Sequence, residues 1–289
     1  MLKAQIEIIY QDNDIIVINK PTGVSVTKDR SGAAELLDIL NGQLGPQISG
    51  QLRLVHRLDK HTSGVMILAK NAETQSVFSS YFEKKLIKKT YLALVTGVVP
   101  DPQGTINIPL MRSHKNPALM CITHKKGKEA VTDWKLLADF GTIDLLAVFP
   151  LTGRTHQIRL HLPGIGLPLA IDPLYGSTRP LFLSDFKSDY RLSKGQTEKP
   201  LIDRLTLHAY QIQLLNPEPN PVRSKRPEGS APLSAGTSNG ANRPAHFIAG
   251  LDKKFAATIK MLTRHNPKGL DAFTDPDDFS KIINAQRLY

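Results

Sequence analysis

A carboxylate between cations is the feature of this sequence best suited to chemistry. Asp59 follows Arg57 in the run His56-Arg57-Leu58-Asp59, and Lys60 comes directly after it. Neighbouring positive charges favour the ionised form of a carboxyl group. Asp59 is therefore a candidate nucleophile or general base. An Asp close to small polar residues and a glycine more commonly caps a backbone amide in a turn, and Asp59 taken alone does not outweigh that interpretation.

A second group of reactive side chains occupies Thr152 to His161. This stretch holds two arginines, two histidines and a glutamine in one turn and one short expected helix. Arginines and helix N-termini bind phosphate well, so the cluster as a whole favours an anion site. It disfavours a metal site, because His156 and His161 are five residues apart and no carboxylate joins them.

A third group is the basic patch of Lys84, Lys85, Lys88 and Lys89, which precedes Tyr91. For any one of these lysines, a solvated helix end is the ordinary interpretation. For Tyr91 the ordinary interpretation is core packing in a strand. The patch and Tyr91 support a functional interpretation only when they are considered together with the other two groups.

Composition indicates a polyanion as the partner. The chain has 289 residues and a net charge of +11, and most of the excess charge lies in residues 1–217, which predicts a binding face on the folded body. Cys121 is the only cysteine, so neither an internal disulfide nor a thiolate metal cluster is expected. The sequence lacks a signal-peptide core and an apolar run of membrane-spanning length, and we expect a cytoplasmic protein with no membrane partner.

The elements that must position these residues alternate between strands and helices. β-Branched runs at 6–10 and 15–19 predict a hairpin. We expect helices at 34–44, from the cap Asn71 to about Lys85, and over 156–162, where Pro163-Gly164 ends the helix. Further strands are expected at 65–69, 90–95, 130–137, 143–149 and 205–215. This order predicts an α/β or α+β fold with a mixed, largely antiparallel sheet and flanking helices.

The composition changes after Asn216. The stretch of about 217–246 is rich in Pro, Gly and Ser and is expected to be a flexible insertion. An amphipathic helix follows, with its apolar residues between Ile248 and Leu262. We therefore expect one catalytic domain over 1–263 that contains the insertion, and a polar C-terminal extension over 264–289.

Five ordered motifs resemble those of the RluA-type pseudouridine synthases. They are the Lys-Pro-x-Gly turn at 20–23, His56-Arg57-Leu58-Asp59 with Thr62-Ser63-Gly64, the tyrosine strand at 89–95, the Thr-Gly-Arg-Thr-His-Gln-Ile-Arg segment at 152–159, and the histidine strand at 207–210. The resemblance covers roughly Ile6 to Leu215. A chance match of five motifs in one order is very improbable.

The resemblance implies the pseudouridine synthase fold with a central active-site cleft. It also implies an enzyme that isomerises uridine in ribosomal or transfer RNA without a metal or organic cofactor. By this likeness, Asp59 is the catalytic aspartate, Tyr91 stacks on the flipped base, and Arg159 pairs with the aspartate. The residues expected to bind RNA or to support the flipped nucleotide are Arg57, His56, Arg154, Lys89 and Thr62.

The sequence also departs from the family pattern. Ile171 stands where relatives have a glycine before Asp172, which puts the geometry of that loop in question. Many relatives carry an S4-type RNA-binding domain before the first strand, and we expect a form without one, acting as a monomer.

Two alternative functions remain. One is an RNA-binding protein that keeps the fold and has lost catalysis. The other is an enzyme with Asp59 as phosphate acceptor, which requires a second acidic cluster for magnesium. The sequence offers no convincing cluster of that kind.

Overall fold

The computed structural model describes residues 5–27, 34–45, 50–187, 189–192, 195–215 and 243–265. Nearly all of the expected insertion at 217–246 and of the C-terminal extension at 264–289 lies outside these residues. The chain divides into two compact units: unit 1 is Met1–Lys89 with Ala209–Ala249, and unit 2 is Thr90–His208 with Gly250–Tyr289. Each unit is described by itself.

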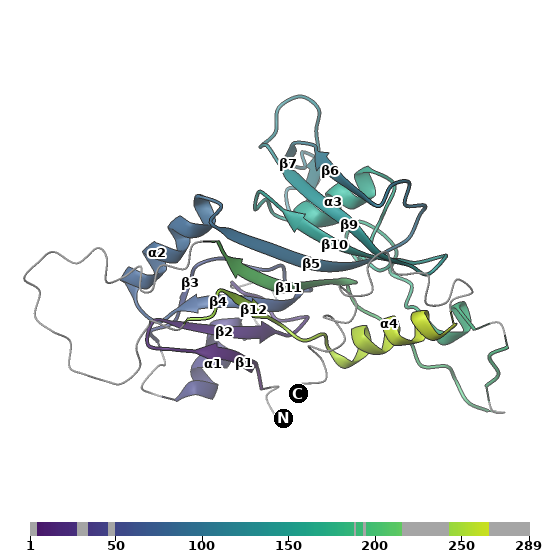
Figure 1. Cartoon of the computed structure of the whole chain (residues 1–289), viewed down its shortest axis with the longest axis horizontal. Helices are drawn as coiled ribbons and strands as arrows, with labels where there is room; N and C mark the ends of the chain where they lie inside the picture. The colour runs from purple at the N-terminus through teal and green to yellow at the C-terminus, as the bar shows by residue number, and fades with distance from the viewer. Residues whose placement is uncertain are drawn as a thin grey trace, which may run out of the picture. The chain divides into compact units, whose positions relative to one another are not determined.

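Unit 1 is built on antiparallel strands that begin with the predicted hairpin. Strands β1 (Glu7–Gln11), β2 (Ile15–Lys20), β4 (Ser63–Ala69) and β11 (Leu207–Leu214) follow one another in this order, with β3 (Arg53–Leu54) on β4 and β12 (His246–Ile248) on β11. All seven residues of β4 are buried, as its apolar run predicts. The helices are α1 (Leu36–Leu44) and α2 (Ala72–Glu83) (Figure 1). Asn71 caps α2 by accepting a hydrogen bond of 2.8 Å from the Thr74 N–H, as predicted.

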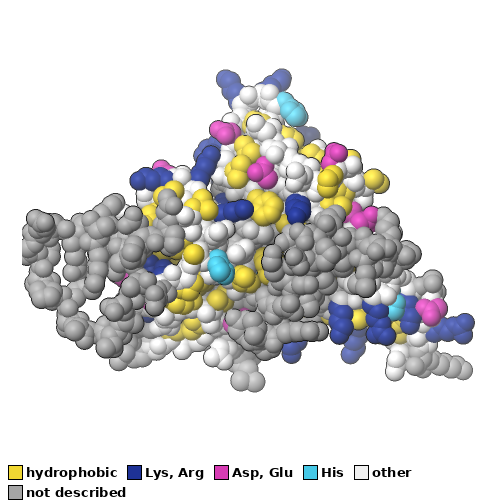
Figure 2. Space-filling view, viewed as in Figure 1, with side chains coloured by type: hydrophobic (Ala, Val, Ile, Leu, Met, Phe, Trp, Pro, Cys, Tyr) yellow, Lys and Arg dark blue, Asp and Glu magenta, His cyan; other side chains and the backbone are white. Residues whose placement is uncertain are grey.

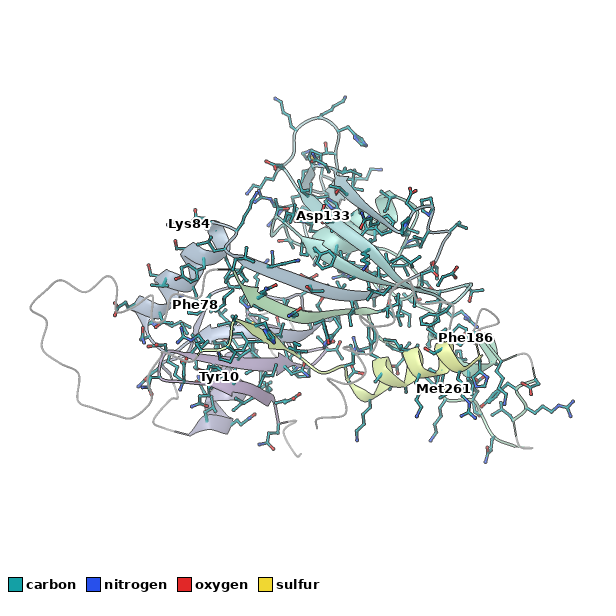
Figure 3. The ribbon with its side chains drawn as sticks, viewed as in Figure 1. Tyr10, Phe78, Lys84, Asp133, Phe186 and Met261 are labelled. Atoms are coloured by element: carbon teal, nitrogen blue, oxygen red, sulfur yellow. The ribbon has the colours of Figure 1, made fainter. Side chains whose placement is uncertain are left out.

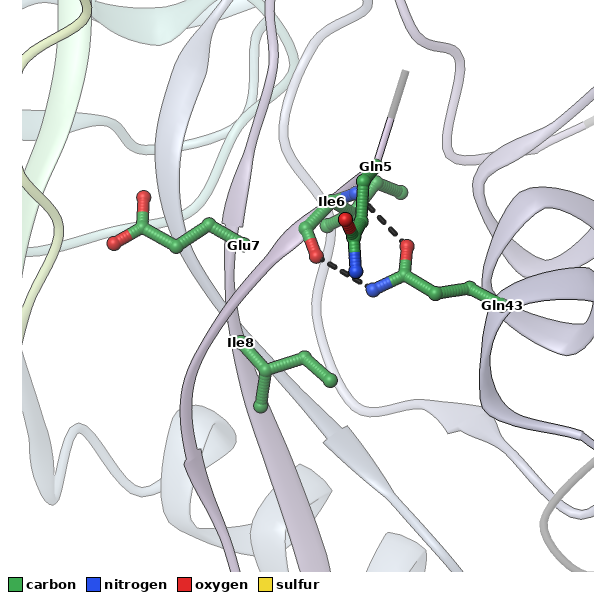
Figure 4. Close-up of a pocket in the computed structure, with 5 residues that line it drawn as sticks. All are labelled: Gln5, Ile6, Glu7, Ile8 and Gln43. Carbon is green, nitrogen blue, oxygen red and sulfur yellow. Dashed lines mark hydrogen bonds between the residues drawn. The ribbon is translucent and has the colours of Figure 1, made fainter. Parts of the chain in front are cut away.

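The amide of Gln43 fixes α1 to the first strand of unit 1. It accepts from the Ile6 N–H and donates to the Ile6 carbonyl, both over 2.8 Å. A shallow pocket here is lined by Gln5, Ile6, Glu7, Ile8 and Gln43 (Figure 4). Because the Gln43 amide is engaged with the backbone and none of the predicted site residues lines the pocket, we assign this feature to packing.

Unit 2 contains a second run of antiparallel strands. Its order is β5 (Ile87–Val95), β10 (Asp144–Pro150), β9 (Val131–Asp139) and β6 (Gln103–Asn107), and β7 (Leu110–Arg112) pairs with β8 (Met120–Ile122) in a separate hairpin. The first three residues of β5 and the last six of β11 belong to unit 1. Helix α3 (Gln157–Gly164), the short 3-10 helix η1 (Leu183–Asp185) and α4 (Lys253–His265) complete the unit. One apolar cluster joins β5, β10, β9 and α3 through side chains such as Ala93, Leu146, Trp134 and Leu162.

The predicted fold class is confirmed, and three details differ from the expectations. Strands β3, β6, β7, β8 and β12 were not predicted. The last amphipathic helix starts at Lys253, later than expected, because His246–Ile248 pairs with β11 as β12. Helix α3 includes Pro163 and ends at Gly164, so this pair forms its last turn. In the described ranges, no helix has the length and apolar character needed to cross a membrane.

Candidate active site

Asp59 lies half-buried on the connection between β3 and β4 in unit 1. Its carbonyl accepts a hydrogen bond of 3.1 Å from the Thr62 N–H, which closes a tight turn around Lys60 and His61. The connection therefore has a defined backbone shape and presents Asp59 at its start. This geometry is compatible with both roles considered for the carboxylate, in chemistry and in the turn.

A second turn holds this connection in place. The Lys20 ammonium is fully buried and donates to three backbone carbonyls, those of Pro21 at 3.0 Å, Val24 at 2.8 Å and Lys60 at 3.1 Å. The Gly23 N–H donates to the same Lys60 carbonyl at 2.9 Å, and its φ of 83° places Gly23 in the left-handed region that suits glycine.

Thr22 adds a further contact between the two turns, because its hydroxyl donates to the His61 carbonyl at 2.8 Å. The Lys-Pro-x-Gly turn thus acts on the Asp59 connection through backbone carbonyls. Sequence reasoning singled out the turn by resemblance but missed this role, which joins residues forty positions apart.

Gly64 allows the start of β4 to approach β11 closely. A Cβ atom at this position would lie 2.1 Å from the Ala209 carbonyl oxygen, and the φ of Gly64 is 119°. Both observations require glycine in the Thr-Ser-Gly part of the motif. Thr62 and Ser63, directly before it, are 2% and 3% exposed. The structure therefore places Thr62, a predicted RNA contact, inside the protein as part of the packing of the connection.

His56 is held as a neutral ring in unit 1. Its Nε2 accepts a hydrogen bond of 3.0 Å from the Ile67 N–H, and the ring stacks on Phe82 at 4.4 Å between centroids. Because Nε2 is the acceptor, the ring proton belongs on Nδ1. Burial, with a smaller contribution from the charge of Lys89, lowers the pKa of His56 to about 3. Burial also lowers the pKa of Lys89, to about 8. Arg57, in contrast, is exposed and accessible to a ligand.

Tyr91 and Arg159 lie on elements that pack on the same core of unit 2. Tyr91 lies half-buried on β5, opposite Val148 of β10, and packs on the apolar cluster that also contains Ile158 of α3. Arg159 is the next residue of that helix and is 1% exposed. The two predicted catalytic residues of this unit thus sit on elements that share one core.

The Arg159 guanidinium is fixed by a buried ion pair with Asp172. Its Nε donates to one carboxylate oxygen at 2.8 Å and its Nη2 to the other at 2.6 Å. A two-point pair of this kind fixes the plane of the guanidinium as well as its position. The guanidinium carbon also lies 5.3 Å from the centre of the Tyr175 ring.

Asp172 also shapes the loop that follows it. Its Oδ1 accepts from the backbone N–H groups of Leu174 at 2.9 Å and Tyr175 at 3.2 Å. The Tyr175 hydroxyl in turn accepts from the Met120 N–H at 3.0 Å and lies 2.7 Å from Nδ1 of His156. Sequence reasoning recorded Asp172 only beside the replaced glycine. The signal in the sequence that could have revealed this role was Asp172 itself, as an acidic residue directly after Ile171.

The rest of the Thr152–His161 segment serves mainly to place α3. The Gln157 side chain donates to the Val131 carbonyl at 2.9 Å and to the Thr132 hydroxyl at 2.8 Å. His161 is fully buried, and burial lowers its pKa. Arg154 is exposed, and its Nε donates to the Glu129 carbonyl at 2.8 Å. Of the two arginines expected to form an anion site, Arg154 is exposed, whereas Arg159 is buried and paired with Asp172.

The comparisons with known proteins show the family to which this chain belongs. Residues 14–163 match the family model described as RNA pseudouridylate synthase, and the chain belongs to that family. Ribosomal large subunit pseudouridine synthase C of Buchnera aphidicola (subspecies Baizongia pistaciae) is 38% identical over 73% of this chain and 63% of its own length. The corresponding synthase D of Neisseria meningitidis is 36% identical, over 74% of this chain and 55% of its own.

An uncharacterized RNA pseudouridine synthase of Zymomonas mobilis matches along more of its length. It is 33% identical over 76% of this chain and 92% of its own. Toward synthases C and D named above, the aligned part of this chain spans less than two thirds of the relative.

Two solved human structures share the fold. RNA pseudouridylate synthase domain containing 4 has a TM-score of 0.60 and 24% identity, and it covers 89% of this chain and 92% of its own. Domain containing 1 has a TM-score of 0.58 and 23% identity, with coverages of 91% and 96%.

Proposed function

We propose that this protein isomerises uridine to pseudouridine in RNA and that large-subunit ribosomal RNA is its substrate. Membership of the RNA pseudouridylate synthase family and the names of the bacterial relatives support the proposal. The observation that carries it is the Asp59 connection, a family motif whose backbone is fixed by the buried Lys20 turn. A defined loop of this kind suits a side chain that must meet one atom of a substrate.

The reaction exchanges one bond to the ribose for another. The bond between N1 of uracil and C1′ of the ribose breaks, the base rotates, and C5 bonds to C1′. The proton that C5 loses is balanced by one that N1 gains, so atoms and charge balance without an added reactant. Two roles of the Asp59 carboxylate fit this sequence: attack on the sugar, or removal of a proton.

Base flipping assigns a role to Tyr91. A uridine must leave the base stack before its glycosidic bond can be reached, which costs a few kcal/mol. Stacking on an aromatic ring contributes roughly 1–3 kcal/mol per base and offsets that cost. The half-buried ring on β5 is fixed by the core of unit 2, so little of its mobility is lost on binding.

The charge and the exposure of the remaining site residues indicate their roles. We infer that Arg159 pairs with the catalytic aspartate during the reaction and that the Asp172 pair keeps its guanidinium oriented. The exposed Arg57 and Arg154 and the half-exposed Lys89 suit contacts with the phosphate backbone. Thr62 is buried and the His56 ring accepts a hydrogen bond from the Ile67 N–H, and we infer that both residues support the RNA site by fixing the Asp59 connection.

Replacing the carboxylate tests the proposal directly. Purified wild-type protein and the Asp59→Asn variant are incubated with unmodified large-subunit ribosomal RNA transcribed in vitro, and pseudouridine is mapped by mass spectrometry. We expect product with the wild type and none with the variant, at equal RNA affinity and thermal stability. Asp101→Asn, which changes an exposed carboxylate of unit 2 in the same way, should retain activity.

Two outcomes would count against the proposal. Pseudouridine formed by Asp59→Asn would remove Asp59 from the chemistry. In the second outcome, the wild type binds RNA without forming product, both with transcribed RNA and with RNA from cells that lack the gene. That result would favour the non-catalytic RNA-binding alternative.

We infer that the protein acts as a cytoplasmic monomer. An RNA substrate and a sequence with only one cysteine fit a reducing compartment. Light scattering with and without RNA measures the stoichiometry, and a dimer at working concentration would contradict the second part of this inference.

A further inference from the structure

Helix α4 has two faces of different character. Phe255, Ile259 and Leu262 are at most 1% exposed and form its apolar face, together with the buried Thr258. These residues recur at spacings of four and three, as expected for a helix that packs along one side. The apolar face is therefore already occupied within the protein.

The opposite face carries a row of cations. Lys253, Lys260 and Arg264 are exposed and are separated by seven and four residues, which places them on one side of the helix. We call this row the α4 stripe. At a rise of 1.5 Å per residue it extends over about 16 Å. Basic side chains gather along α4 in the space-filling view (Figure 2). Figure 3 labels Met261, which follows Lys260 on this helix.

Helix stability accounts for Arg264, which lies in the last turn where the helix dipole favours a positive charge, but not for the other two cations of the stripe. Surface helices usually mix both signs of charge, whereas α4 has no acidic residue. Lys253 lies in the first turn, where the helix dipole disfavours a positive charge. Lys254 next to it is compensated by Asp203 at 2.7 Å, but among the described residues none of the three stripe cations makes an ion pair.

The N-terminus of α4 is anchored. The carboxylate of Asp252 accepts from the N–H groups of Lys254 and Phe255, both at 3.0 Å, and thus caps the helix. Asp252 also pairs with Arg204, whose guanidinium carbon lies 5.2 Å from the centre of the Phe255 ring. The stripe is therefore carried by a backbone that is already fixed before a ligand binds, which lowers the ordering cost of binding.

We propose that the α4 stripe binds the phosphate backbone of the RNA substrate, away from the reacting uridine. This inference rests on the proposed function. Three cations in a row that make no ion pair among the described residues match a polyanion, and proteins neutralise nucleic acid phosphates with such lysines and arginines. A membrane surface fits less well, because the apolar residues that would enter lipid are buried in the protein.

A charge-removing triple variant, Lys253→Gln/Lys260→Gln/Arg264→Gln, tests the stripe. Glutamine keeps the helix propensity, and the three positions are exposed, so the melting temperature should not change. Affinity for unmodified large-subunit ribosomal RNA is measured over a series of salt concentrations. We expect weaker binding and a slope of log K against log salt that is shallower by about two to three, since each phosphate contact contributes about 0.7–0.9.

A measurement of turnover distinguishes a failure of this inference from a failure of the proposed function. At saturating RNA the triple variant should form pseudouridine at the wild-type rate, with only KM raised. If the wild type forms no pseudouridine, the proposed function fails, and the salt slopes still report on RNA binding by the stripe.

The matched control keeps the charge. Lys253→Arg/Lys260→Arg/Arg264→Lys should bind with the wild-type salt slope. An unchanged slope and affinity in the charge-removing variant would overturn the proposal. So would stripe-dependent binding to vesicles of phosphatidylserine and phosphatidylcholine with no change in RNA affinity, which would assign the stripe to a membrane surface.

Discussion

The connection that carries Asp59 and the helix that carries Arg159 are fixed by different kinds of interaction. In unit 1, Lys20 and Thr22 donate to backbone carbonyls of the connection, so the loop is held by its main chain. In unit 2, Asp172 binds the guanidinium itself, so the arginine is held by its own charged group. The first arrangement fixes the backbone from which the Asp59 side chain extends. The second fixes the position of the Arg159 guanidinium itself.

This difference suits the two roles proposed. A carboxylate that must approach and leave a substrate needs a fixed backbone and a side chain that can adjust. A cation that only stabilises charge works best when it is fully oriented beforehand. Variants in the two regions should therefore fail in different ways, one through loop geometry and the other through charge balance.

The largest effect is expected from Asp172→Asn. The variant removes the carboxylate charge that pairs with the buried Arg159, and breaking a buried pair in this way costs about 3–5 kcal/mol. Asparagine can still accept from the loop amides, so the loop should keep its shape. Urea unfolding measures the stability, and single-turnover kinetics should show a much lower kcat with little change in KM.

Asp185→Asn is the control for this experiment. Arg179 and Asp185 form the same kind of two-point pair, but the Arg179 side chain is 63% exposed. Solvent screens such pairs, so the loss of stability should be far smaller. Equal losses in the two variants would mean that burial of the Arg159 pair has no special importance.

A smaller loss is expected from Lys20→Met. Methionine fills a similar volume but leaves the carbonyls of Pro21, Val24 and Lys60 without their charged donor, at a cost of about 2–3 kcal/mol. The loosened connection should lower kcat more than RNA affinity. Lys70→Met removes a donor to the Asp12 carbonyl in the same unit and should leave kcat unchanged. A Lys20→Met variant with wild-type kcat would show that the Asp59 connection is fixed by other means.

The same contrast explains what the sequence could predict of the fold. Strands β2 and β4 were predicted because they are continuous apolar runs that become almost wholly buried. Strand β6 was not, because Ile106 is its one buried residue and pairing with β9 determines its conformation. Long-range pairing overrides a weak local pattern in such short strands.

The candidate site divides in a similar way. Asp59 and Arg159 were found because local motifs mark them. The supports, Lys20 and Asp172, act over forty and thirteen positions, and a fully buried lysine runs against composition rules. Thr62 was assigned to RNA from its place in the motif, but only the folded chain shows that it is buried.

The smallest effect concerns His56, which belongs to the backbone-held region and whose pKa differs between the folded and the unfolded chain. Its pKa is about 3 in the folded protein and 6.5 when unfolded. Between these values the unfolded chain binds the additional proton, so His56 lowers the stability of the fold as the pH falls from 6.5 toward 3. The loss should be on the order of 1–2 kcal/mol at pH 5.

Glutamine in place of His56 can accept from the Ile67 N–H and does not titrate. The difference in unfolding free energy between wild type and His56→Gln, measured in urea at pH 7 and pH 5, should therefore move in favour of the variant at pH 5. If the difference is the same at both pH values, the His56 ring can take up a proton in the folded state. The support of the Asp59 connection would then not depend on a neutral histidine.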